Sequence, residues 1–327
     1  MISRVASSCF WLNRHAERTE ALARFLAVNR AFVLDVDLPA ADRWRPLVVV
    51  AGEEPNFLAE HGRDAFEDGE AVEAFLTWSE VNPTSLRNSV YWMRENARTI
   101  RETISLEMWT TVNALWLWIN SATARKLYQR ERDEFYLHVR DQCVLYQGHT
   151  LSTMLHEEPF DFMRLGTAVE RVGQTARMLD VKYHSLGPTQ GGVTEGPDEA
   201  AQWLAILRSC SAVEPFFKRR ANEFSGPAVA GFLLLDGRFP RSVAHNLDRA
   251  YNFLERVRGP SRSGLGTQST AELQALLLFV RELTIDRVLE QGIHNVLTRI
   301  VDDSATVCVK IHGDFFEPSI AVQKKAG

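Results

Sequence analysis

The chain has 327 residues, of which 45% are hydrophobic and 24% are charged, and its formal net charge is −5. This composition is that of an ordinary globular protein, and the length allows one or two domains around a large core. General nucleic-acid binding needs a basic excess, so the acidic balance argues against a nucleic-acid partner.

The cysteines and the apolar runs do not indicate a disulfide framework, a zinc site or a membrane span. The four cysteines are single residues with no CxxC pair. The most apolar run, 108–119, is about 12 residues long and contains Thr110, Thr111 and Asn113, so it is too short to cross a bilayer. We therefore expect a cytoplasmic protein with no membrane partner, no metal and no cofactor.

The first predicted helix includes residues 10–26. Its apolar residues recur at alternating steps of three and four, beginning upstream at Val5, as expected for a helix with one buried face. Glu17 and Arg18 flank this face about 100° apart, so they cannot pair with each other on their own helix. Arg18 has apolar neighbours, so we expect it to be partly buried and to need a carboxylate partner.

Helical patterns continue through the first half of the chain. Residues 38–56 contain three prolines around the apolar run 47–50, which is either one helical turn or a buried extended piece. A helical pattern resumes at 64–80. The longest one then follows from 84 to 115, and it predicts the central helix of this half.

This long helix carries Arg94, Glu95 and Arg98 close together. Two arginines four residues apart repel each other unless acids from another helix lie between them. Glu17 and Glu170 are our candidates for those acids. The alternative is a charged stripe on the surface of the helix.

After another amphipathic helix at 131–155, residues 162–179 repeat the pattern of the first helix. At an offset of 153 residues, Glu17-Arg18 falls on Glu170-Arg171, and Arg24 falls on Arg177. We therefore predict an all-α helical bundle with long central helices, built by tandem duplication. The predicted halves are 1–157 and 158–327, joined in one compact unit.

Two glycines flank Glu170 on its helical face, Gly166 four residues before it and Gly173 three residues after it. A glycine inside a helix costs about 1 kcal/mol relative to alanine. Two of them beside one acid indicate close approach by another helix or by a ligand. The alternative for both Glu-Arg dyads is a solvated polar face, held by pairs such as Glu20 with Arg24.

The remainder is predicted to be a long loop followed by short helices. The glycine- and proline-rich segment 186–199 is the loop, and only 307–311 alternates at period two. The predicted helices are 200–211, 214–224, 228–235, 241–258 and 270–289 with a continuation to 300. No P-loop, GxGxxG, GxSxG or HExxH motif occurs. Any catalysis would therefore use glutamate and arginine, with Glu17 and Glu170 as the candidate glutamates and Tyr183 or His184 just beyond the second dyad helix.

Several motifs together resemble the bacterial alpha-E family. They are Trp11, Arg14, Glu17-Arg18 and Ala23-Arg24; Phe162, Arg164-Leu165-Gly166, Glu170-Arg171, Thr175, Arg177 and Lys182-Tyr183; Asn82-Pro83-Thr84-Ser85; Arg94-Glu95-Asn96-Ala97-Arg98; Leu207-Arg208-Ser209; and Phe239-Pro240-Arg241-Ser242. That family is a predicted all-helical group named for its Glu-Arg motif and typically duplicated in tandem. Asn13 and His15 depart from the glycine and tyrosine that the resemblance would place in the first dyad helix.

The resemblance implies a setting and not a mechanism. Such proteins are found beside, or fused to, circularly permuted ATP-grasp ligases and transglutaminase-like proteins, which suggests peptide synthesis or modification. Three interpretations follow: an accessory component that binds an anionic peptide, an intermediate or the ligase; an enzyme of amide-bond chemistry with a glutamate base; or a scaffold whose charges only fix the bundle. The candidate binding residues are Arg14, Glu17, Arg18, Arg24, Arg94, Glu95, Arg98, Glu170, Arg171, Arg177 and Tyr183.

Overall fold

The structure is a computed structural model that describes residues 2–35, 39–185, 197–220, 223–259 and 264–317. Within these ranges every regular element is a helix, so the predicted all-α fold class is confirmed. None of the helices in these ranges combines the length and the apolar character that a membrane span requires.

The helices follow one another in two series. The first comprises α1 (Ser3–Asp35), α2 (Ala40–Ala51), α3 (Glu54–His61), η1 (Asp64–Glu67), α4 (Gly69–Trp78), α5 (Leu86–Thr99), α6 (Leu106–Ile119), α7 (Ala122–Arg130) and α8 (Arg132–Thr153). The second comprises α9 (Glu158–Ser185), α10 (Pro197–Ser209), α11 (Val213–Arg219), α12 (Gly226–Leu235), α13 (Val243–Arg258), α14 (Thr267–Arg281), α15 (Ile285–Gln291), α16 (Ile293–Ile311) and η2 (His312–Phe316).

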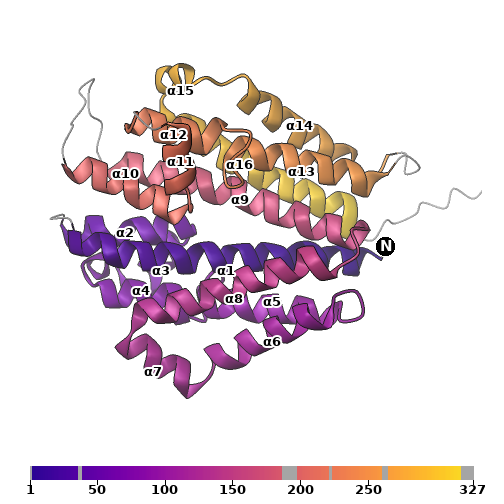
Figure 1. Cartoon of the computed structure of the whole chain (residues 1–327), viewed down its shortest axis with the longest axis horizontal. Helices are drawn as coiled ribbons and strands as arrows, with labels where there is room; N and C mark the ends of the chain where they lie inside the picture. The colour runs from indigo at the N-terminus through magenta and orange to yellow at the C-terminus, as the bar shows by residue number, and fades with distance from the viewer. Residues whose placement is uncertain (1, 36–38, 186–196, 221–222, 260–263, 318–327) are drawn as a thin grey trace, which may run out of the picture.

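The two helices that carry the Glu-Arg dyads, α1 and α9, lie side by side through the middle of the molecule (Figure 1). Helices α5 and α8 pack on α1, and α13 and α16 pack on α9. Contacts between α1 and α9 advance together along both helices, from Asn13 with Thr167 to Arg18 with Glu170, so the two helices run parallel. The dyads therefore meet at the centre of the bundle.

Close approach of α1 and α9 depends on Gly166. A Cβ atom at this position would lie 2.4 Å from the carbonyl oxygen of Phe10 and 3.2 Å from Cγ of Arg14. No side chain fits at that distance from a backbone oxygen, so only glycine allows the two helices this spacing. The close approach predicted at Gly166 is confirmed, and the approaching element is α1.

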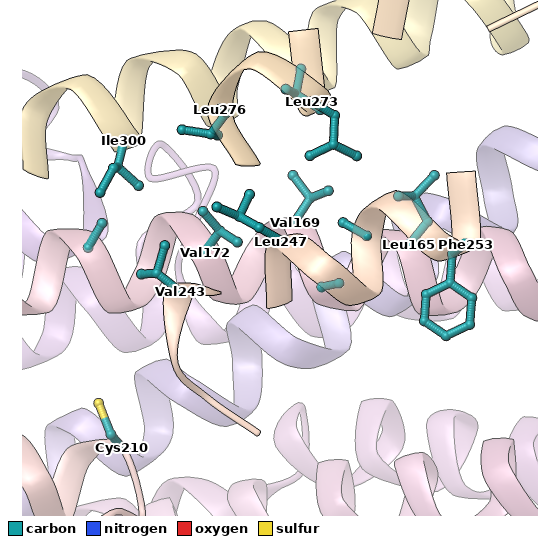
Figure 2. Packing of buried hydrophobic residues seen from close by; sticks show 14 of the residues in the cluster. Leu165, Val169, Val172, Cys210, Val243, Leu247, Phe253, Leu273, Leu276 and Ile300 are labelled. Carbon is teal, nitrogen blue, oxygen red and sulfur yellow. The ribbon is translucent and has the colours of Figure 1, made fainter. Parts of the chain in front are cut away.

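Apolar side chains on the far side of α9 form much of the core. Figure 2 shows how they lie between four helices. The labelled residues include Leu165, Val169 and Val172 from α9, Val243, Leu247 and Phe253 from α13, Leu273 and Leu276 from α14, and Ile300 from α16. Because one face of α9 is fixed by this packing, its opposite side holds the dyad against α1.

Two of the predicted helices are broken in the structure. The helix predicted at 84–115 ends at Thr99, and α6 begins after Ser105, whose side chain accepts a hydrogen bond from the Met108 amide. Ile100 and Ile104 in the connecting turn are buried, so the apolar spacing continues across the break. The apolar spacing therefore predicted the burial of these residues correctly but the continuity of the helix wrongly. The helix expected from 270 to 300 is likewise three helices, α14 to α16.

Three segments that the sequence left open or assigned differently are helical. The run 47–50 lies in α2, and the alternating run 307–311 lies in α16, where Val307 and Ile311 are buried one turn apart. Of the loop predicted at 186–199, residues 186–196 lie outside the described residues, and 197–199 form the first turn of α10.

Candidate functional site

The carboxylate of Glu170, on α9, is held by two arginines of α1. Arg14 donates from Nε to Oε2 at 2.8 Å, and Arg18 donates from Nε to Oε1 at 2.8 Å and from Nη2 to Oε2 at 3.1 Å. Gln174 donates to Oε1 at 3.2 Å. The glutamate side chain is 1% exposed, so these groups replace water around the charge.

The carboxylate of Glu17, on α1, is held in the reverse sense by α9. Arg171 lies 2.8 Å from Oε1 through Nε and donates from Nη2 to Oε2 at 2.8 Å. Arg241, from the segment before α13, donates to Oε1 at 2.9 Å, and Gln147 of α8 donates to Oε2 at 3.0 Å. Each glutamate thus pairs with the arginine of the other dyad, and neither pairs with its own neighbour.

Both carboxylates are ionised at neutral pH. Burial alone would raise the pKa of Glu17, but attraction to Arg171 and Arg241 outweighs it and lowers the pKa to about 2. Burial likewise opposes ionisation of Glu170, and Arg18 and Arg14 hold the pKa of that carboxyl well below its usual range. Charges of this kind bind cations strongly and accept protons poorly.

A third buried acid, Glu20, lies beside Glu17 on α1 and contacts the same arginine, Arg241. It pairs with Arg24 on its own helix, and it accepts a hydrogen bond from Nη2 of Arg241 at 2.8 Å. Its side chain is fully buried. The interpretation of Glu20 with Arg24 as a solvated surface pair is therefore wrong, because Arg241 closes over both acids.

Asn13 connects three helices. Its Nδ2 donates to Oγ1 of Thr167 on α9 at 3.2 Å, and Tyr146 of α8 donates its hydroxyl hydrogen to Oδ1 at 2.6 Å. The side chain thus bridges α1 to both α8 and α9. This bridge fixes the register of α1 against α9 one turn before the dyads.

A small recess adjoins the Glu170 side of the cluster. It has about 40 Å³ of room for water-sized molecules and lies between α1, α2, α9 and the start of α5. Its polar lining is Arg18, Glu170, Gln174, Arg177 and Thr84, and its apolar lining is Ala21, Leu22, Phe25, Val50, Ala51 and Met178. Such convergence of a few polar groups in an apolar-walled hollow is typical of a small-molecule site.

Arg177 is the arginine of this recess with fewer protein partners, since Arg18 is paired with Glu170. Its Nε donates to the carbonyl oxygen of Val50 at 3.0 Å. Burial lowers the pKa of this guanidinium, and attraction to Glu170 only partly offsets that effect. Among the described residues, neither of its terminal nitrogens has a hydrogen-bond or ion-pair partner.

Arginines outnumber acids in this cluster, which we call the arginine cluster. It contains seven arginines and three glutamates: Arg14, Arg18, Arg24, Arg164, Arg171, Arg177 and Arg241, with Glu17, Glu20 and Glu170. Burial, with repulsion from neighbouring arginines, lowers the pKa of Arg24 and of Arg164 to about 10. This local excess of positive charge, inside a chain of net charge −5, favours an anion as the ligand.

Three predicted site residues on α5 have other partners. Arg94 donates to Glu95 at 3.0 Å and to Asn113 at 2.9 Å, and Arg98 donates to Glu95 at 2.5 Å. The prediction that Glu17 or Glu170 lies between the two arginines is therefore wrong, because Glu95 on the same helix supplies the acid. The side chain of Tyr183 lies outside the described part of the chain.

Three residues of the arginine cluster, Glu20, Arg164 and Arg241, were not among the predicted site residues, and neither was Gln147, which donates a hydrogen bond to Glu17. Glu20 was visible in the sequence only as an i,i+4 partner. Arg241 was part of the Phe239-Pro240-Arg241-Ser242 motif. In the sequence, the one indication that Arg241 belongs to the site was therefore its place in a motif to which we had assigned no role.

Comparison with known proteins identifies a family that carries a Glu-Arg motif. A family model described as a predicted alpha-helical domain with a conserved ER motif, named Alpha-E, matches residues 1–316. The chain belongs to the Alpha-E family. Uncharacterized proteins of Mycobacterium bovis and Mycobacterium tuberculosis are 23% identical to this Alpha-E chain over 313 residues, which is 91% of the chain and 35% of each relative. It therefore spans about a third of the length of these relatives. No solved structure matches the chain.

Proposed function

We propose that this Alpha-E protein is an accessory, binding component of an ATP-grasp-linked system of peptide synthesis or modification. In this role it holds an anionic group, carried by a peptide or by an intermediate, at the arginine cluster. The observation that carries the proposal is the recess beside Arg18 and Arg177, where guanidinium groups exceed the available carboxylates.

We also propose that the fold arose by tandem duplication. The exchanged pairs support this idea. Under the sequence offset of 153 residues, Glu17 corresponds to Glu170 and Arg18 to Arg171, so the pair of Glu17 with Arg171 is the counterpart of the pair of Glu170 with Arg18. The matching packing of α5 and α8 on α1, and of α13 and α16 on α9, is a second support.

The size of the curated relatives supports an accessory role. About two thirds of each relative lies outside the part that this chain matches, so the Alpha-E region is joined there to other sequence. A region that binds one group and is joined to a larger protein is suited to presenting that group to a partner. In our proposal, an ATP-grasp ligase is that partner.

The other two interpretations account for less of the cluster. A glutamate general base needs a pKa near the working pH, whereas arginines depress the pKa of Glu17 and of Glu170. A purely structural network suits the Glu17 side, where the acids are fully paired. It does not explain Arg177, because an extra buried cation costs desolvation, and a backbone carbonyl is the group that Arg177 contacts instead of a carboxylate of its own.

Anion binding can be tested on the full chain by titration calorimetry with acetate, inorganic phosphate and a short acidic peptide, at constant ionic strength. We expect saturable binding of at least one anion, weakened at least tenfold by Arg177→Gln. Arg98→Gln is the matched control, because Arg98 is 65% exposed and outside the cluster. Equal binding by both variants, or none by the wild type, would show that the arginine cluster is not an anion site.

The accessory role needs a separate measurement. The chain would be mixed with an ATP-grasp ligase encoded beside it, and product formation would be followed with and without the chain. We expect the ligase to need the chain for full activity, and Arg177→Gln to remove that effect while Arg98→Gln retains it. A ligase that is indifferent to the chain would overturn the accessory role and leave anion binding standing.

A further inference from the structure

The two dyads have unequal surroundings, and the difference identifies what is missing from one of them. At the offset of 153 residues, Arg24 corresponds to Arg177, and Glu20, which pairs with Arg24, corresponds to Gly173. A Cβ atom at Gly173 would lie 3.3 Å from Nη1 of Arg177. The guanidinium of Arg177 therefore lies over bare helix where its counterpart meets a carboxylate.

A second charged residue is also replaced at the recess. Ser85 and Ser242 both cap a helix, accepting hydrogen bonds from the amides of Asn88 and His245, and each follows a proline by two residues. The residue between proline and serine is Arg241 in one case and Thr84 in the other. Arg241 reaches across to the acids of α1, whereas the shorter Thr84 lines the recess.

The Glu170 dyad thus lacks the acid and the arginine that fill the Glu17 dyad. Thr84, in the position of that arginine, lines the recess, and so does Arg177, whose guanidinium lies beside Gly173. Its volume of about 40 Å³ is room for about three water-sized groups. A carboxylate, with three heavy atoms, fits in that room, and the apolar part of the ligand would lie against the walls that lead out of it. One carboxylate also carries the single negative charge that Glu20 carries on the other side.

The walls of the recess indicate what such a carboxylate is attached to. Leu22, Phe25, Val50 and Met178 line the hollow beside Arg18 and Arg177. Apolar walls around a charged floor select a ligand whose charge is at one end and whose remaining surface is apolar. An acidic peptide side chain flanked by polar groups would place those polar groups, instead of apolar ones, against the apolar walls.

We propose that this recess binds the carboxylate of an apolar residue or acyl group, and that the carboxylate pairs with Arg177 as Glu20 pairs with Arg24. The inference rests on the proposed function, since it names the class of anion that the cluster takes. Two sources share this chemistry, the C-terminal apolar residue of a peptide and a free branched aliphatic acid.

Titration calorimetry on the full chain distinguishes them with N-acetyl-leucine, isovalerate and a tripeptide ending in leucine as ligands. N-acetyl-leucinamide, which lacks the carboxylate, is the negative control. We expect the three acids to bind at least tenfold more tightly than the amide. Tightest binding of the tripeptide would assign the site to peptide C-termini, and equal binding of isovalerate would assign it to the aliphatic acid.

Two variants test the pairing with Arg177. Gly173→Glu supplies the carboxylate from within the chain and should weaken N-acetyl-leucine binding at least tenfold, because the nearest obstacle is the movable end of Arg177. Arg177→Gln should do the same by removing the cation, so the test survives if the first variant fails to fold. Arg98→Gln should bind as the wild type does.

The outcomes separate this inference from the proposed function. If phosphate binds in an Arg177-dependent manner and the three acids do not, the cluster is an anion site and the apolar carboxylate is the wrong ligand. If neither phosphate nor any carboxylate binds, the proposed function fails together with the inference.

Discussion

Replacing Glu170 by glutamine should destabilise the protein more than any surface ion-pair substitution. The carboxylate is 1% exposed, and it accepts hydrogen bonds from Arg14, Arg18 and Gln174. Removing its charge leaves two partly buried guanidinium groups without a counterion in a cluster already rich in arginine. Breaking a buried pair from one side costs about 3–5 kcal/mol, whereas an exposed pair contributes about 0–1 kcal/mol.

The assay is urea unfolding of the wild type and of Glu170→Gln, followed by both circular dichroism and tryptophan fluorescence. Coincident transitions with equal slopes allow the two free energies of unfolding to be compared. Glu223→Gln is the matched control, because Glu223 pairs with Arg220 at 3.0 Å while both side chains are more than half exposed. A loss below about 1 kcal/mol for Glu170→Gln, equal to that of the control, would refute the reasoning.

A second variant tests whether the loss comes from the stranded arginine. Arg18→Gln in the Glu170→Gln background removes one of the two unpaired cations. The double variant should therefore be less destabilised than the sum of the single variants, by about 0.5–3 kcal/mol. Simple additivity would mean that the two side chains do not interact.

Three further predictions concern other parts of the cluster. Because the pKa of Glu17 is lowered to about 2, its ionised carboxylate stabilises the fold at pH values above about 4.5, and this contribution is lost as the pH falls from about 4.5 toward 2. The free energy of unfolding of Glu17→Gln should therefore approach that of the wild type over this pH window. A constant difference between the two would contradict the assignment. Gly166→Ala should lower the free energy of unfolding in urea by about 1–3 kcal/mol, because the added Cβ meets the Phe10 carbonyl. Gly148→Ala, with open space around it in α8, should raise the free energy of unfolding by about 0.5–1 kcal/mol. Equal effects of the two substitutions would contradict the close contact of α1 with α9. Arg177→Gln should change the free energy of unfolding by less than about 1 kcal/mol. The lost hydrogen bond to Val50 and the lost attraction to Glu170 are offset by relief of the burial cost of the charge and of repulsion from Arg18 and Arg14, and a loss as large as that of Glu170→Gln would make Arg177 a structural residue.

Periodicity predicted the helices and their buried faces because burial is a local property of spacing. The predicted apolar face of α1, from Cys9 to Leu26, is buried in the structure. Spacing also showed that Glu17 and Arg18 need partners outside their own helix, and both have them. The break after Thr99 was missed, because buried Ile100 and Ile104 continue the pattern through a turn.

The identity of the partners could not be read from the sequence. The position of a residue on a helix gives the direction of its side chain. Its partner depends on which other helix packs on that face and in what axial register. Arg94 and Arg98 were assigned to distant glutamates, while Glu95 lies beside them and satisfies both. Arg241 reaches Glu17 from a position more than 200 residues away in the chain, which only the packing of α13 against α9 determines.

The exchange of charges between α1 and α9 has a consequence for the order of folding. Arg18 and Glu170 are 152 residues apart in sequence, and Arg171 and Glu17 are 154 apart. During synthesis, the leading helix therefore emerges with its acids and bases hydrated, and they cannot lose that water until the other dyad helix has been made and docked. Contacts between residues this far apart in sequence form late, because closing the intervening loop costs conformational entropy. Final dehydration of the centre is thus a joint step of both halves, and neither fragment alone can complete it.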